Sequence, residues 1–142
     1  MPRTQRLISK LVVACAVAGL IGCGGGTGPS DMTEVVEGNA VIPALSLTVV
    51  PIQIGRQGNL SSVITWNNFF NDIDSGLLRG TCTAPEVSAN AAGCNVEAAL
   101  GFDDTNRSPS RFDASVTPGA YSLLIYNFGF SADTAFYRLE IN

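Results

Sequence analysis

The carboxylates are the side chains of this sequence whose spacing best suits chemistry. Asp72 and Asp74 lie two residues apart in NDIDSG, so in a strand both side chains point to one face. Asp103 and Asp104 follow in the polar loop GFDDTNRSPSRFD, which also offers the side-chain oxygen of Asn106. Loop oxygens of this kind suit Ca²⁺, which takes about six to eight oxygen ligands in a flexible geometry. The spacing therefore predicts a candidate calcium site formed by Asp72, Asp74, Asp103 and Asp104.

The same carboxylates are also typical of solvated turns, because they lie among Asn, Ser and Gly and lack the spacing of an EF-hand loop. A glycosidase uses two carboxylates in different protonation states, but nothing beyond the number of acidic residues indicates one. The sequence has no histidine, which excludes the Ser–His and Cys–His pairs of nucleophilic enzymes. We expect a protein that is not an enzyme.

Aromatic side chains form a second candidate site. In WNNFFND, Trp66, Phe69 and Phe70 lie close together in the chain, where exposed rings can stack on sugars or on a protein partner. The alternative is that Trp66 belongs to the core and that a phenylalanine covers the edge of the fold. The run YNFGF at residues 126–130 leaves the same choice open. Trp66, Phe69 and Phe70 are the predicted binding residues.

These residues must be positioned by strands, because short apolar runs alternate with turn residues along the chain, as in an all-β sandwich or barrel. In the final run, Ala135, Tyr137, Leu139 and Ile141 share one face of the strand, and Arg138 and Glu140 lie on the other. This alternation indicates one buried and one solvent-exposed face. The run AYSLLIYNF is apolar on both faces and is predicted to be a central strand. Together with the runs at 44–54, 58–67, 76–82 and 95–102, these indicate about six to eight strands.

Two stretches resemble one known family. PGAYSLLIYNFGFSADTAFYRLEI is similar to the closing hairpin of pre-peptidase C-terminal domains, and VITWNNFFNDIDSGLL is similar to two earlier strands of that family. The resemblance covers residues 42–142 and implies a single antiparallel, jelly-roll-like β-sandwich. It also implies a binding or folding module rather than an enzyme, and some relatives bind calcium.

The amino terminus has the layout of an export signal. Basic residues precede an apolar run at 11–21 that is too short to span a membrane. LIGC, at residues 20–23, resembles the lipobox of bacterial lipoproteins, which implies cleavage after residue 22 and acylation of Cys23. An ordinary signal peptide with an incidental cysteine is the alternative. Gly24 follows this cysteine, where an aspartate would resemble the inner-membrane retention signal of enteric bacteria, so we expect the outer membrane.

Removal of residues 1–22 leaves five arginines against twelve acidic residues, a side-chain charge of −7. This acidic chain lacks the basic face that nucleic acid or anionic headgroups require. Cys82 and Cys94 are the cysteines that remain besides Cys23, and in an exported chain they are expected to pair. The alternative is a zinc site, but two cysteines without any histidine cannot supply its four ligands.

The predicted organisation has three parts: a signal peptide at 1–22, the lipidated cysteine and a flexible linker at 23–41, and a β-sandwich at 42–142. The segment DMTEVVEGNAV could be either part of this tether or a first edge strand. The predicted function is that of an envelope lipoprotein, held in the bilayer through acylated Cys23, which acts as a non-catalytic binding or structural module. An envelope protein or a polysaccharide is the expected partner. The alternative is a carbohydrate-binding accessory domain stabilised by Ca²⁺.

Overall fold

The structure, a computed structural model, describes residues 33–142. The predicted signal peptide and Cys23 lie outside these residues. Within them, no helix is both long and apolar enough to cross a membrane. The strands are β1 (Glu34–Ile42), β2 (Ser46–Ile54), β3 (Gly58–Trp66), β4 (Ile73–Arg79), β5 (Gly101–Asp103), β6 (Ser110–Val116), β7 (Gly119–Asn127) and β8 (Asp133–Ile141). A short helix, α1 (Ala84–Ser88), and a 3₁₀ turn, η1 (Val96–Ala98), lie between β4 and β5.

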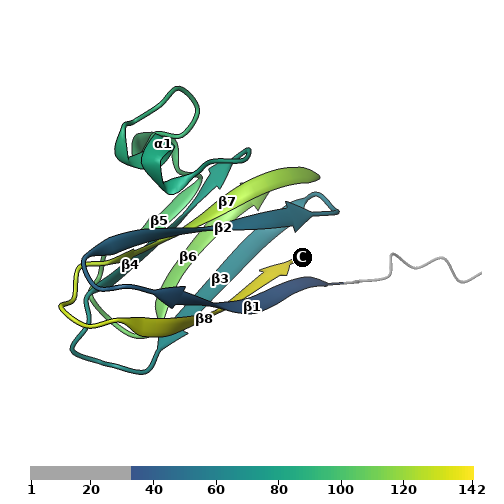
Figure 1. Cartoon of the computed structure of the whole chain (residues 1–142). Helices are drawn as coiled ribbons and strands as arrows, with labels where there is room; N and C mark the ends of the chain where they lie inside the picture. The colour runs from purple at the N-terminus through teal and green to yellow at the C-terminus, as the bar shows by residue number, and fades with distance from the viewer. Residues whose placement is uncertain (1–32) are drawn as a thin grey trace, which may run out of the picture. The chain divides into compact units, whose positions relative to one another are not determined.

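The strands form two four-stranded antiparallel sheets that pack face to face (Figure 1). Their orders are β1-β8-β3-β6 and β2-β7-β4-β5. The first strand pairs with the eighth, the second with the seventh, the third with the sixth and the fourth with the fifth. This nested pairing is that of one long hairpin folded over itself, the arrangement of a jelly roll. The predicted all-β, jelly-roll-like sandwich is therefore confirmed.

The main core lies between the two sheets. Every strand except β5 contributes residues to it, mostly at alternate positions, since successive side chains of a strand point to opposite faces. Ile64 and Trp66 of β3, for example, are buried there together with Leu139 of β8. Burying a side chain of this size stabilises the fold by about 2 kcal/mol.

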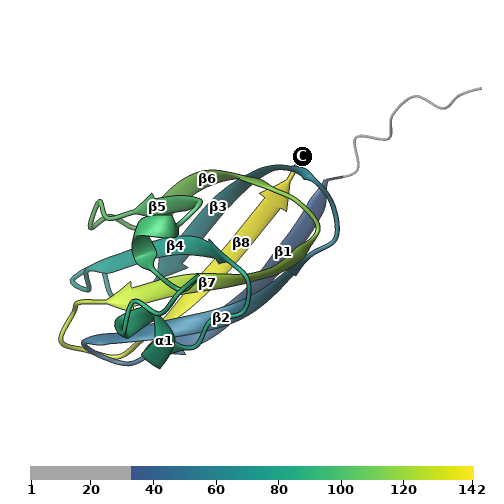
Figure 2. The same ribbon diagram turned by 90° about the horizontal axis from the view of Figure 1, so that it is seen from above.

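Strand β7 is buried on both faces, as expected for a central strand. Tyr121, Leu123 and Ile125 face the main core. Leu124 faces the other way, into a second cluster that it forms with Leu78 and with residues of the segment 80–100. This segment joins β4 to β5 and carries α1 and η1, and we call it the excursion. This excursion covers the outer face of the β2-β7-β4-β5 sheet (Figure 2).

The excursion is closed by the predicted disulfide between Cys82 and Cys94. Both half-cystines are buried against Leu124 and Leu78, so the bond also fills part of the second cluster. The run at 95–102, expected as one strand, instead forms η1 followed by the three-residue strand β5. Asn95 caps η1 by accepting a hydrogen bond from the backbone N–H of Glu97, which competes with the extended conformation.

The predicted domain boundary at residue 42 lies too late in the chain. Residues 34–42 form β1, which pairs with β8 along its whole length, so the first edge strand considered for this segment is confirmed. The inward positions of β1 include Gly38 and Ala40, so the strand has little of the apolar pattern that marks a core strand. A Cβ atom at Gly38 would collide with the ring and hydroxyl of Tyr137, which lies across this position.

Four connections meet at one end of the sandwich: β1–β2, β3–β4, β5–β6 and β7–β8. The registers show this directly, because Ile42 pairs with Asp133, and Asn127 pairs with both Ser46 and Ile73. Thr33 and Asn142 lie at the opposite end, where the Thr33 hydroxyl donates to Asn142 Oδ1 at 2.7 Å. Figures 1 and 2 both show the start of β1 beside the C-terminus and far from these loops.

Candidate binding site

Large apolar side chains are exposed at the loop end of the sandwich. Leu45, Phe69, Phe70, Phe128 and Phe130 form this group, which we call the aromatic tip. Phe70 and Phe130 are 82% and 90% exposed, and Phe69 is 76% exposed. Four of the seven phenylalanines of the sequence therefore lie in solvent within two loops. Single exposed apolar residues are ordinary, but a cluster of them marks an interaction surface.

Strand pairing brings the tip together from distant parts of the chain. Leu45 belongs to the β1–β2 turn, Phe69 and Phe70 to the β3–β4 loop, and Phe128 and Phe130 to the β7–β8 loop. The backbone N–H of Leu45 donates to the carbonyl of Gly129 at 3.1 Å, and that of Phe128 donates to the carbonyl of Asp72 at 2.8 Å. The β7–β8 loop is thus hydrogen-bonded to both of the other loops.

The buried carboxamide of Asn127 fixes two of these loops. Its Nδ2 lies within hydrogen-bond distance of the carbonyl oxygens of Ile42, Pro43 and Ser131, at 3.3, 3.0 and 2.9 Å. Its Oδ1 accepts from the backbone N–H of Gly129 at 2.8 Å. One side chain therefore replaces the backbone partners that the β1–β2 and β7–β8 loops lack.

A second set of polar side chains joins the β3–β4 loop to the start of β8. The Asp133 carboxylate accepts from the backbone N–H of Asn68 at 2.8 Å and from Asn71 Nδ2 at 3.3 Å. The Ser131 hydroxyl donates to Asn71 Oδ1 at 3.1 Å. Gly129 packs so closely on these groups that a Cβ atom there would collide with Asn71 Oδ1. The loops are thus held by buried polar contacts while their phenylalanines face the solvent.

The predicted binding residues separate into two groups. Phe69 and Phe70 lie on the aromatic tip, with ring centroids 4.1 Å apart and planes tilted by 36°. Trp66 is 7% exposed and packs in the main core. The alternative that Trp66 is a core residue is therefore confirmed, and its prediction as an exposed binding residue is wrong. The sequence reasoning did not place Leu45, Phe128 and Phe130 with Phe69 and Phe70. The aromatic run YNFGF indicated that Phe128 and Phe130 could be exposed, but not that they lie at the same end of the fold as Phe69 and Phe70.

The four predicted calcium ligands lie at the same end of the sandwich, near the tip. Asp74 pairs with Tyr126 across β4 and β7, and Asp72 precedes β4. Burial, followed by the charges of Asp72, Asp104 and Asp103, raises the pKa of Asp74 to about 6. Its Oδ1 atom is buried and has no hydrogen-bond partner. The carboxylates are therefore close enough to repel one another.

Asp103 has a structural role in its loop. Burial by itself raises its pKa, but hydrogen bonds from the backbone of Arg111, at 2.6 Å, and from Thr105 and Ser110 outweigh this and hold the pKa below its usual value. Within residues 33–142, no three acidic or cysteine side chains are grouped so that they could hold a metal ion. The calcium site at Asp72, Asp74, Asp103 and Asp104 therefore stays a prediction.

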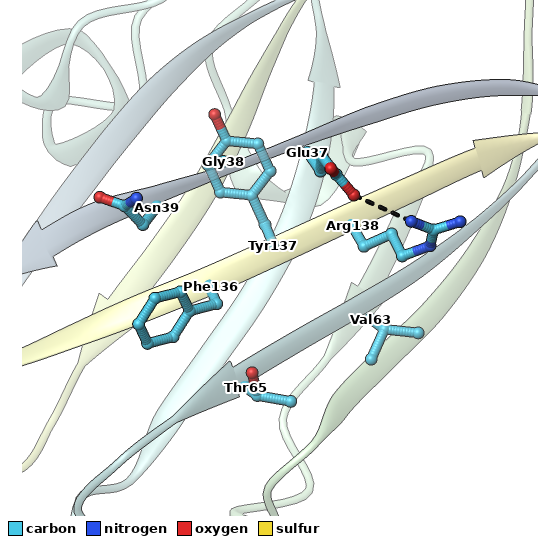
Figure 3. A pocket seen from close by; sticks show the side chains of 8 residues that line it. All are labelled: Glu37, Gly38, Asn39, Val63, Thr65, Phe136, Tyr137 and Arg138. Atoms are coloured by element: carbon cyan, nitrogen blue, oxygen red, sulfur yellow. Dashed lines mark hydrogen bonds and ion pairs between the residues drawn. The ribbon is translucent and has the colours of Figure 1, made fainter.

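A shallow pocket of about 550 Å³ lies elsewhere, on the outer face of the β1-β8-β3-β6 sheet (Figure 3). Phe136, Asn39 and Thr65 line it, together with Glu37 and Arg138. The Glu37 carboxylate, the one acid in this lining, accepts from Arg138 Nη1 at 2.8 Å and is engaged in an ion pair. Phe136 is half exposed, so the pocket offers one ring on a flat sheet rather than a cluster of rings.

Comparisons with known proteins bear on the fold alone. No protein-family model matches the chain, and no curated protein matches it either. Among solved structures, the chain is similar to PliG of Aeromonas hydrophila, a periplasmic inhibitor of g-type lysozyme, with 7% identity, a TM-score of 0.53 and coverage of 76% of this chain and 86% of that one.

Two further solved structures match with a TM-score of 0.48 each. One is the pre-peptidase C-terminal domain of a collagenase from Bacillus anthracis, at 14% identity over 78% of this chain and 90% of that one. The other is the mitogen from Yersinia pseudotuberculosis, at 13% identity over 78% and 88%. The likeness to PliG supports the β-sandwich, and at these identities no residue role can be carried over to this chain.

We expect Asn127→Asp to destabilise the protein at pH 7 by about 3 kcal/mol, because a carboxylate oxygen would face three carbonyl oxygens in a buried site. Urea denaturation followed by Trp66 fluorescence measures this. Asn39→Asp, on the exposed face of β1, is the matched control and should change the free energy of unfolding by less than about 0.5 kcal/mol. Equal effects of the two variants would contradict the role of Asn127.

The raised pKa of Asp74 means that the folded state favours its protonated form. Its contribution to stability is present below about pH 4 and is lost as the pH rises through about 6. Relative to the wild type, Asp74→Asn should therefore gain about 1 kcal/mol between pH 4 and pH 7.5, once solvent screening is allowed for. Urea denaturation at several pH values tests this, with Asp113→Asn as the control for the loss of one charge. A difference that does not change with pH would refute it.

The calcium prediction has a direct test. If Asp72, Asp74, Asp103 and Asp104 bind Ca²⁺, the melting temperature in millimolar CaCl₂ should exceed that in chelator, since a ligand bound only to the folded state stabilises it. Asp72→Asn should abolish the difference. Equal melting temperatures in calcium and in chelator would end the prediction.

Proposed function

We propose that this protein is a non-catalytic binding module of the bacterial cell envelope. In this proposal it is anchored through acylated Cys23 and engages a protein partner with its aromatic tip. The observation that supports it is the set of four exposed phenylalanines on two loops that polar side chains hold in place. The tip lies at the end of the sandwich opposite Thr33, where the described chain begins.

The exposed rings supply the energy that such binding requires. Burying a phenylalanine against a partner contributes about 1.5–3 kcal/mol. Because the loops are already hydrogen-bonded, little conformational entropy is lost when a partner docks, and more of that energy appears as affinity. An interface of this kind relies on a few aromatic anchors rather than on its whole area.

The arrangement of the rings favours a protein over a polysaccharide. Phe69 and Phe70 pack against each other at a tilt, so they do not form a flat row on which successive sugar rings would stack. Their side chains also carry no hydrogen-bonding group for sugar hydroxyls. A calcium-stabilised carbohydrate-binding domain is the second candidate, and it rests on the prediction at Asp72 and Asp74.

The position of the tip suits a protein anchored by its amino terminus. The chain enters the sandwich at β1, and β1 ends at the β1–β2 turn that carries Leu45. An anchor before residue 33 therefore attaches at the end away from the tip and leaves it free for a partner. A fold of this kind also occurs in PliG, a periplasmic inhibitor of g-type lysozyme.

We expect Phe70→Ser/Phe130→Ser to abolish binding of the partner. Cross-linked pull-down of the tagged, full-length lipoprotein from its own envelope, followed by mass spectrometry, should yield one stoichiometric protein with the wild type and none with this variant. Phe136→Ser is the matched control, because it removes an exposed ring from the pocket on the β1-β8-β3-β6 sheet, and this variant should still capture the partner. If the tip variant retains the same partner, the proposed function is wrong. Capture of polysaccharide in place of protein would favour the second candidate.

A further inference from the structure

We propose that the partner presents arginine or lysine side chains to the aromatic tip and to the carboxylates beside it, so that the interface is cationic on the partner's side. This inference rests on the proposed function and specifies the chemistry of its partner. Two observations support it. Aromatic rings lie next to carboxylates, and the negative charge of these carboxylates is not paired with an arginine.

Rings and carboxylates lie on the same part of the surface. Tyr126 stacks on Phe128 with parallel rings at 5.8 Å. Tyr126 also faces Asp74 in the register of β7 and β4, and the charge of Asp74 acts on the Tyr126 hydroxyl. The backbone of Asp72 accepts the N–H of Phe128, which places these two residues against each other at the tip.

The neighbouring strand adds another ring and another carboxylate. Phe102 of β5 pairs with Gly76 of β4. The two residues are so close that a Cβ atom added at Gly76 would lie 2.5 Å from the Phe102 ring. Asp104 follows two residues later, and its charge reaches Asp74. Oriented to match its neighbours, the Asn106 carboxamide donates to Asp72 Oδ1 at 2.6 Å and to the backbone carbonyl of Asp104 at 3.2 Å. The β3–β4 and β5–β6 loops are thereby joined.

No arginine neutralises these carboxylates within residues 33–142. The ion pairs of this part of the chain are those of Arg138 with Glu37 and Glu140, on the outer face of the other sheet. Arg107 lies in the same β5–β6 loop and is exposed, but it makes no ion pair with Asp72, Asp74 or Asp104. Burial is the main cause of the raised pKa of Asp74, and the charges of Asp72, Asp104 and Asp103 raise it further, as expected where negative charge is in local excess.

A guanidinium or ammonium group matches this surface in two ways. It relieves the repulsion among the carboxylates, and it packs on the face of an aromatic ring, where the ring quadrupole attracts a cation. Arginine has the additional advantage of a planar fork that pairs with a carboxylate through two hydrogen bonds. An acidic or phosphorylated partner would meet like charge and lose affinity.

Fluorescence anisotropy of labelled decaarginine and decaglutamate with the full-length chain in non-ionic detergent tests this. We expect decaarginine to bind at 50 mM NaCl and to weaken at 300 mM, and decaglutamate not to bind. Asp72→Asn/Asp104→Asn should weaken decaarginine binding at least fivefold. The control Glu97→Gln/Asp113→Asn removes the same net charge from exposed positions away from the tip and should change binding less than twofold.

Equal weakening by the two double variants would mean that net charge alone attracts the peptide, and it would overturn the inference, as would an absence of decaarginine binding. The envelope partner gives an independent readout. If Phe70→Ser/Phe130→Ser abolishes its capture while Asp72→Asn/Asp104→Asn leaves it unchanged, the cationic partner is wrong and the proposed function stands. If the phenylalanine variant leaves capture unchanged, the proposed function itself fails.

Discussion

The carboxamide of Asn127 is the contact on which the loop end of the molecule depends. It lies at the last position of β7, the strand that is buried on both faces, so its backbone is held firmly by the cores beside it. From there its nitrogen reaches carbonyl groups of the two loops that flank it, and its oxygen accepts from Gly129. A buried amide with all its partners present fixes geometry, whereas a buried amide without them destabilises the fold.

The rigidity of β7 has its own cause in the excursion between β4 and β5. A sandwich this small would leave the outer face of its central strand in water, which would favour polar residues there. Here α1, η1 and the Cys82–Cys94 disulfide cover that face, and Leu124 and Leu78 are buried beneath them. The chain thus obtains a second apolar cluster without a third sheet, and the strand that carries Asn127 gains support from both sides.

The fold was predictable from the sequence because its signals are local. Alternation at residues 135–141 and the run of β7, which is apolar on both faces, indicate strands with one and with two buried faces. The exposed pair Phe69 and Phe70 was also found in this way. Its grouping with Phe130 and Leu45 was not, because it depends on pairing between strands far apart in the chain. Strand β1 could not be told from a tether, because Gly38 carries no side chain and its place is taken by Tyr137 of β8.

The separation of the two ends of the sandwich has a mechanical consequence. If the chain is anchored before Thr33 and a partner bound at the loop end is pulled away, the force acts along the strands rather than across them. The hydrogen bonds between antiparallel strands are perpendicular to the strand direction. A pull along β1 therefore loads its whole ladder with β8 at once, from Glu34 opposite Ile141 to Ile42 opposite Asp133, instead of peeling the pairs apart in turn. Under such tension the β1–β8 ladder is loaded in shear and its hydrogen bonds resist together.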